Sequence, residues 1–253
     1  MSELRALLIP DASNKRTSLQ ALQGRFCAAA RRRGIVPEVR QSAEFLYAFP
    51  GGDFLSPLPE CDLVLFLARD AHLAAMLEQA GLRVFPSARA VSLCADRALL
   101  HFILQDFPTP RTVPYPSGLP DAALLRPTED AVGYPMAVKA RHTRQTLIAR
   151  DREELLSALR VLPDGALLQE YLPESEAIRL CMAGGECVSA SCPPTERETA
   201  LARKACETLG LPFAEIALLR STRGPLLCGV DPAAPFDTDA VGHALDAVLH
   251  GLE

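Results

Sequence analysis

The sequence predicts a parallel α/β region followed by an α+β region within one chain of 253 residues. In the first third, short and fully apolar strands alternate with helices, a pattern typical of a parallel sheet covered on both faces. In the last third, glycine-containing turns separate short apolar runs, which predicts antiparallel hairpins. Hydrophobic residues make up 49% and charged residues 23% of the chain, an ordinary globular balance.

The first third is expected to contain four strands, at residues 4–9, 35–39, 63–67 and 84–85. A helix from about Thr17 to Arg33 follows the first strand, and Gly34 ends it. Asp70 is expected to cap a second helix that runs to Gly81. Residues 10–14 read Pro-Asp-Ala-Ser-Asn, so no glycine-rich fingerprint follows the first strand and a Rossmann-type dinucleotide site is not predicted.

The remaining elements follow from periodicity and turn residues. Expected are a helical region at 87–105, a proline-broken segment at 107–113, strands at 136–140 and 166–172, and a helix at 152–159. Two hairpins are expected, one at 178–182 and 186–189 about Gly184-Gly185, the other at 213–219 and 225–230 about Arg223-Gly224. Thr195 and Glu198 form a capping box that opens a helix ending near Gly210, and a last helix covers about 238–252.

Charge and hydropathy exclude several classes of function. The net charge of −5 gives no basic field for a nucleic-acid backbone, so no nucleic-acid partner is expected. No apolar stretch approaches the roughly 20 residues that span a bilayer, and no signal peptide is recognised, so a cytoplasmic protein without a membrane partner is expected. The eight cysteines are scattered without a CxxC pair, which is typical of reduced thiols, and the spacing of Cys181, Cys187 and Cys192 does not match a zinc knuckle.

Six short strings and one longer block occur in an order that is informative together. They are AGLRVFP at 80–86, ADR at 95–97, FPTPRT at 107–112, YPMAVK at 134–139, LQEYL at 168–172, IRL at 178–180 and the block 197–230. This series resembles the ATP-grasp superfamily, and the last block is similar to RimK-like ligases. The resemblance covers essentially the whole chain. It implies an ATP-grasp fold with an N-terminal α/β (pre-ATP-grasp) domain at 1–86, a central lobe at 87–165 and a C-terminal lobe at 166–253.

The resemblance implies ligase chemistry, in which ATP and Mg²⁺ activate a carboxylate as an acyl phosphate for attack by an amine. Lys139 and Arg97 would then contact the phosphates, and Arg179 would be a catalytic arginine. The strand formed by Gln169, Glu170, Tyr171 and Leu172 would meet adenine. Other interpretations stay open: a solvated Lys139, a structural ion pair of Arg179, and either a ribose contact or simple solvation for Glu170.

Several positions depart from the family pattern. Ala217 stands where the family has a metal-binding aspartate, and Gly229 where it has the bridging glutamate. Asp231 replaces an asparagine and is the one remaining, weak candidate for a metal ligand. Residues 140–148, after Lys139, contain no glycine, although a flexible loop normally closes over the phosphates there.

Two basic side chains and a histidine in that former loop are alternative phosphate contacts. They are Arg141, His142 and Arg144, and His142 could also be a plain exposed loop residue. No nucleophile–base pair for hydrolysis is recognised elsewhere.

Three functions remain open. The leading hypothesis is a RimK-like pseudoenzyme that binds a ligand or regulates a partner. The alternatives are a divergent but active ATP-dependent carboxylate–amine ligase and a binding module for a non-nucleotide ligand. ATP and Mg²⁺ are expected if the site works and no cofactor otherwise. An amino acid, a peptide or a protein partner is possible, and the last helix would either support a homodimer or pack into the body.

Overall fold

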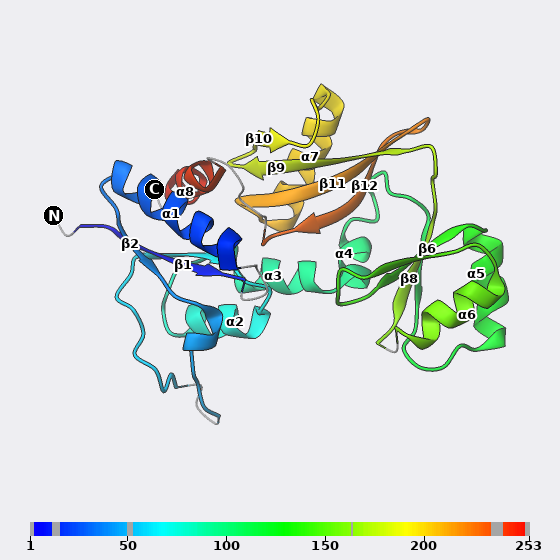
Figure 1. The fold of residues 1–253 in the computed structure, drawn as a ribbon, viewed down its shortest axis with the longest axis horizontal. Coiled ribbons are helices and arrows are strands. Elements are labelled where there is room, and N and C mark those ends of the chain that lie inside the picture. Colours follow the sequence, from blue (N-terminus) through cyan, green and yellow to red (C-terminus); the bar gives the residue numbers. More distant parts are fainter. Residues whose placement is uncertain (1–2, 12–15, 50–52, 163, 234–239, 251–253) are drawn as a thin grey trace. The chain divides into compact units, whose positions relative to one another are not determined.

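The computed structural model describes residues 3–11, 16–49, 53–162, 164–233 and 240–250 (Figure 1). The chain forms two compact units. The first comprises Met1–Ser92, Arg179–Ile216 and Val230–Glu253, and the second comprises Leu93–Ile178 and Ala217–Gly229. The three consecutive domains predicted from the sequence stay a prediction.

A parallel sheet covered on both faces forms the core of the first unit. Its strand order is β2 (Val36–Val39), β1 (Arg5–Pro10), β3 (Leu63–Leu67) and β4 (Val84–Phe85). Alternate residues of β1 point to opposite faces. Ala6 and Leu8 belong to a core with α1 (Arg16–Arg32) and α8 (Ala240–His250), whereas Leu7 and Ile9 belong to a core with α2 (Ala71–Gln79) and α3 (Ala88–Ala95).

The last helix is part of that core. The side chains of Val241, Ala244, Leu245 and Val248 are at most 1% exposed and pack against α1. The apolar face of α8 is therefore used inside the unit, as one of the two interpretations predicted. The predicted ends of this helix, Thr238 and Leu252, lie outside the described residues, as do residues 12–14 of the turn after β1.

Side-chain caps confirm two predicted helix starts. Asp70 accepts a hydrogen bond from the N–H of Leu73 at 2.9 Å and begins α2. Thr195 and Glu198 form the reciprocal capping box of α7 (Glu196–Leu209), which satisfies two of the free N–H groups at a helix start. Gly210 ends α7 with a φ of 65°, a left-handed conformation that glycine adopts without steric cost.

Both predicted hairpins are present and join in one sheet. Its order is β10 (Glu186–Ala190), β9 (Glu176–Ala183), β11 (Phe213–Ser221) and β12 (Gly224–Asp231). Strands β9 and β10 are antiparallel about Gly184 and Gly185, both of which have positive φ. The second hairpin turns immediately before Gly224.

The second unit contains an antiparallel sheet backed by two helices. Its order is β5 (Thr112–Tyr115), β8 (Ala166–Glu170), β6 (Met136–Ala140) and β7 (Thr146–Ala149). Helices α5 (Ala122–Val132) and α6 (Arg152–Arg160) contribute Leu125 and Leu155 to its core. In the described part of the chain, no helix is both long and apolar enough to cross a membrane.

Three local predictions need correction. The helical region predicted at 87–105 is two helices, because Asp96 interrupts it and caps α4 (Arg97–Ile103) through the N–H of Ala98. The strand predicted to end at residue 172 ends at Glu170. Helix α5 was not predicted, because Pro127 lies inside it and proline normally ends a helical pattern.

Candidate functional site

Three basic side chains of the second unit lie close enough to repel one another; we call Arg97, His101 and Lys139 the basic cluster. Lys139 is on β6, is partly buried and donates from Nζ to the carbonyl of Cys228 at 3.4 Å. Burial lowers the pKa of the Lys139 amine. The charge of Arg97 lowers this pKa further, whereas Cys228 raises it. In the described part of the chain Lys139 forms no ion pair, so its charge has no carboxylate to balance it.

The other two members of the basic cluster come from α4. Nη1 of Arg97 donates to the carbonyl of Ala140 at 3.2 Å, and burial, followed by repulsion from Arg144, lowers the pKa of Arg97. Burial, followed by repulsion from Lys139 and Arg97, lowers the pKa of His101 to about 4. His101 is therefore neutral at pH 7, and the cluster carries the two charges of Lys139 and Arg97.

The turn after Lys139 is held to the start of α4. Arg141 makes a two-pronged ion pair with Asp96, with Nη2 at 2.6 Å and Nε at 2.9 Å from the carboxylate oxygens. The hydrogen bonds from Arg141 lower the pKa of Asp96 against the opposing effect of burial. The N–H of Ala140 also donates to the carbonyl of Gln145 at 3.0 Å, closing a short turn. Of the alternative phosphate contacts, Arg141 is therefore bound to Asp96, while His142 and Arg144 are exposed.

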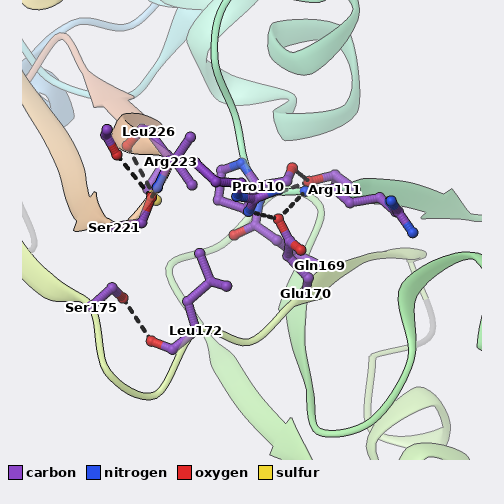
Figure 2. Close-up of polar contacts among 12 residues, drawn as sticks. Pro110, Arg111, Gln169, Glu170, Leu172, Ser175, Ser221, Arg223 and Leu226 are labelled. Atoms are coloured by element: carbon purple, nitrogen blue, oxygen red, sulfur yellow. Dashed lines mark hydrogen bonds and ion pairs between the residues drawn. The ribbon is translucent and has the colours of Figure 1, made fainter.

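The strand predicted to meet adenine is held by its own side chains (Figure 2). Gln169 is 2% exposed, and its Nε2 donates to Oγ1 of Thr112 at 2.7 Å. Glu170 Oε1 accepts from the N–H of Arg111 at 2.9 Å and from the guanidinium of Arg223. Burial raises the pKa of Glu170, but these hydrogen bonds outweigh it and the net shift is downward.

The last two residues of that predicted strand lie beyond β8. Tyr171 is 40% exposed, and its N–H donates to the carbonyl of Pro135 at 3.4 Å. The carbonyl of Leu172 accepts from Oγ of Ser175 at 2.6 Å, as Figure 2 shows.

The two positions where the resemblance expects metal-binding carboxylates are neighbours. A Cβ built on Gly229 would lie 3.9 Å from the Cβ of Ala217, and no other heavy atom of the described residues outside its chain neighbours would come within 4 Å. Carboxylates at these two positions would therefore lie side by side, but neither residue present carries a side-chain oxygen.

In the first unit, both site candidates are ion-paired. Arg179, on β9, places Nη1 2.6 Å from Oε1 of Glu215 on β11. Asp231 ends β12 and places Oδ2 2.9 Å from Nη2 of Arg69, whose Nη1 lies 2.6 Å from Oδ2 of Asp11. We call Asp11, Arg69 and Asp231 the Arg69 bridge. Among the described residues, no group of three or more His, Cys, Asp or Glu side chains could hold a metal ion.

Solved structures match over nearly the whole chain. A RimK domain ATP-grasp protein from Sphaerobacter thermophilus DSM 20745 gives a TM-score of 0.75 at 22% identity, covering 97% of this chain and 99% of its own. D-alanine–D-alanine ligase from Bacillus anthracis complexed with ATP gives 0.73 at 15% identity, covering 99% and 97%. The ATP-grasp ligase PsnB, complexed with a phosphomimetic variant of its minimal precursor, Mg and ADP, gives 0.69 at 13% identity, covering 100% of both chains.

The chain has an ATP-grasp fold. This confirms the predicted fold class. No protein-family model matches the sequence. A curated relative, the Uncharacterized protein MG012 homolog of Mycoplasma pneumoniae (strain ATCC 29342 / M129 / Subtype 1), is 26% identical over 144 residues, which are 50% of this chain and 49% of the relative. The chain spans about half the length of this curated relative.

Within this ATP-grasp fold, the structure brings Arg97 and Lys139 together, and it engages Gln169 with Thr112 and Glu170 with Arg111 and Arg223. Three side chains that interact with the candidate residues were not predicted from the sequence: His101, Arg69 and Arg223. Arg69 had a signal, because it follows β3 as Asp11 follows the neighbouring strand β1, and ligands of open α/β sheets bind at the carboxyl ends of strands.

Proposed function

We propose that this protein is a non-catalytic ATP-grasp protein that binds an anionic ligand, first of all a nucleotide polyphosphate, at the basic cluster. The observation that carries the proposal is the partly buried ammonium of Lys139, which has no carboxylate partner among the described residues. A charge removed from water without a partner is unfavourable. A phosphate group next to Lys139 and Arg97 would offset that cost, and both residues would hold it.

The nucleotide is favoured over other anions by the neighbours of the fold. One is a ligase solved with ATP and another a ligase solved with Mg and ADP. In this chain the backbone at Glu170 to Leu172 is the stretch that would face adenine. The carboxylate of Glu170 would have to leave Arg223 to reach a ribose hydroxyl.

Metal-dependent ligation does not fit the residues present. Mg²⁺ requires several hard oxygen ligands, and phosphoryl transfer relies on such ions to neutralise the charge of the transition state. Ala217 and Gly229 supply no oxygen, and Asp231 is bound to Arg69. In addition, the turn after Lys139 is tied down by Arg141 instead of offering a flexible row of glycine N–H groups.

The alternative is an active, divergent carboxylate–amine ligase with an amino acid or a peptide as acceptor. The names of the solved neighbours, D-alanine–D-alanine ligase and a ligase bound to its precursor, support this alternative. The retained Lys139 is compatible with either function.

Thermal unfolding with ATP, ADP and inorganic triphosphate, each with Mg²⁺ or with EDTA, tests the proposal. A ligand at about 100 times its Kd should stabilise the fold by about 2.7 kcal/mol, equally in both buffers. Lys139→Met should abolish the shift, and the matched control Lys204→Met, at an exposed lysine, should keep it.

Two results would contradict the proposal. Stabilisation that requires Mg²⁺, together with ADP release that depends on an added amino acid or peptide, would establish the ligase alternative. No stabilisation by any of the three anions would exclude a polyphosphate ligand.

A further inference from the structure

The Arg69 bridge joins two carboxylates to one guanidinium at the carboxyl edge of the parallel sheet. Asp11 directly follows β1, and Arg69 lies two residues beyond the end of β3. The side chains of Asp11 and Asp231 are only 12% and 15% exposed, and that of Arg69 is 39% exposed. The bridge is thus better shielded from water than an ordinary surface ion pair, and its charges interact more strongly.

Both oxygens of Asp231 are already engaged. Oδ2 accepts from Arg69 at 2.9 Å, and Oδ1 accepts from the N–H of Ala233 at 3.1 Å. A divalent cation would have to displace the guanidinium to reach Oδ2. Asp231 is therefore a poor metal ligand, although it is the one carboxylate left among the three positions to which the resemblance assigns metal ligands.

Strand geometry relates Asp231 to the two lost ligands. Gly229 and Asp231 are two residues apart on β12, and side chains two apart on a strand point to the same face. Position 229 is in turn next to Ala217, at 3.9 Å between Cβ positions. Positions 217 and 229 thus carry no side-chain oxygen, and the carboxylate at position 231 is bound to arginine. This set of side chains does not fit a metal ion.

We propose that the guanidinium of Arg69 takes the place that a divalent cation would need at Asp11 and Asp231, and that it keeps this edge closed to Mg²⁺. A guanidinium supplies a permanent positive charge and directed N–H donors. It cannot, however, coordinate carboxylate and phosphate oxygens together in one shell as a metal ion does. The inference rests on the proposed function, because it explains how the site dispenses with a metal.

Mn²⁺ binding in the absence of nucleotide tests this inference, with free Mn²⁺ counted by electron paramagnetic resonance. The wild-type protein should show no Mn²⁺ binding at about 1 mM, whereas Arg69→Gln and Arg69→Met should bind it measurably at that concentration, because the guanidinium no longer occupies Oδ2 of Asp11 and Asp231. A second substitution, Asp231→Asn, should remove the gain. Arg69→Gln keeps a side chain that can donate to one carboxylate, so a folded variant remains if Arg69→Met unfolds.

Two outcomes would overturn the inference. One is equal Mn²⁺ affinity with and without Arg69 in folded protein. The other is binding of Mn²⁺ by the wild-type protein that Asp231→Asn abolishes. Since no nucleotide is present, failure of the proposed anion binding would leave both readouts unchanged, and the two proposals can fail separately.

Discussion

The basic cluster and the Arg69 bridge differ in how their charges are balanced. In the bridge, one guanidinium contacts two shielded carboxylates at 2.6 and 2.9 Å. In the cluster, Lys139 and Arg97 share a partly buried region and donate only to backbone carbonyls in the described structure. A balanced set contributes to folding by itself, whereas an unbalanced one costs stability until a ligand supplies the missing charge. The charges of the bridge therefore stabilise the fold, whereas those of the cluster are available to bind a ligand.

The largest expected effect is the pH dependence caused by His101. Its pKa is about 4 in the folded protein and 6.5 ordinarily, so between these values the unfolded chain binds more protons and stability falls as the pH falls. The full difference corresponds to a loss on the order of 3 kcal/mol between pH 6.5 and pH 4. Urea unfolding at about pH 7 and pH 5 should show a smaller loss in His101→Gln than in the wild-type protein.

The exposed His72 provides the control for this measurement. His72→Gln makes the same substitution at an exposed histidine outside the basic cluster. If His101→Gln matched the wild type, burial and repulsion by Lys139 and Arg97 together would not hold the pKa of His101 low in the folded protein.

The second effect tests the bridge. Arg69→Met leaves Asp11 and Asp231 without their shared cation and should lower the free energy of unfolding by about 2 kcal/mol, between the values for exposed and buried ion pairs. Urea unfolding at neutral pH measures it. Arg5→Met is the matched control, because Arg5 pairs with a Glu60 side chain that is 91% exposed, and it should cost less than about 0.5 kcal/mol. Equal losses of unfolding free energy in both variants would mean that the bridge contributes no more than an exposed ion pair.

The contrast between these two regions was only partly predictable from the sequence. Strands, caps and hairpins follow from local signals, and Asp70, Thr195 and the glycine turns lie where those signals placed them. The motif order also singled out Lys139, Ala217 and Gly229 as site positions, and their roles stay predictions. Ion pairs between distant segments leave no local signal: Arg69 and Asp231 are 162 residues apart.

His101 illustrates the same limit within one helix. From the sequence it is a helical histidine without an acidic or serine partner. Its environment comes from Lys139 on another element and from burial that only the tertiary structure supplies. Helix α5 was missed for a different reason, since Pro127 contradicts the local pattern but is tolerated one and a half turns into the folded helix.

The third effect has the opposite sign to the second. Lys139→Met removes a partly buried charge that has no carboxylate partner and should raise the free energy of unfolding of the ligand-free protein by about 1 kcal/mol. The pKa of Lys139 is lowered in the fold, so this gain should diminish as the pH rises toward the lysine's ordinary 10.5. Urea unfolding at neutral and alkaline pH measures both, with Lys204→Met as the control. A loss of stability instead would mean that the amine is balanced within the protein.

The smallest effect concerns a balanced pair inside the same unit as the basic cluster. Arg223 is 50% exposed and Glu170 19% exposed, so Arg223→Met should cost only about 0.5 kcal/mol at neutral pH. The pKa of Glu170 is lowered in the fold, so this contribution is present above the ordinary value of 4.5 and disappears as the pH falls. A carboxyl NMR titration should show the pKa of Glu170 rising in Arg223→Met and staying low in Arg223→Lys. An unchanged pKa would assign the shift to the N–H of Arg111 and leave Glu170 available to a ligand. If the pKa of Glu170 rises when Arg223 is replaced by methionine, a nucleotide ribose must compete with this arginine for the Glu170 carboxylate.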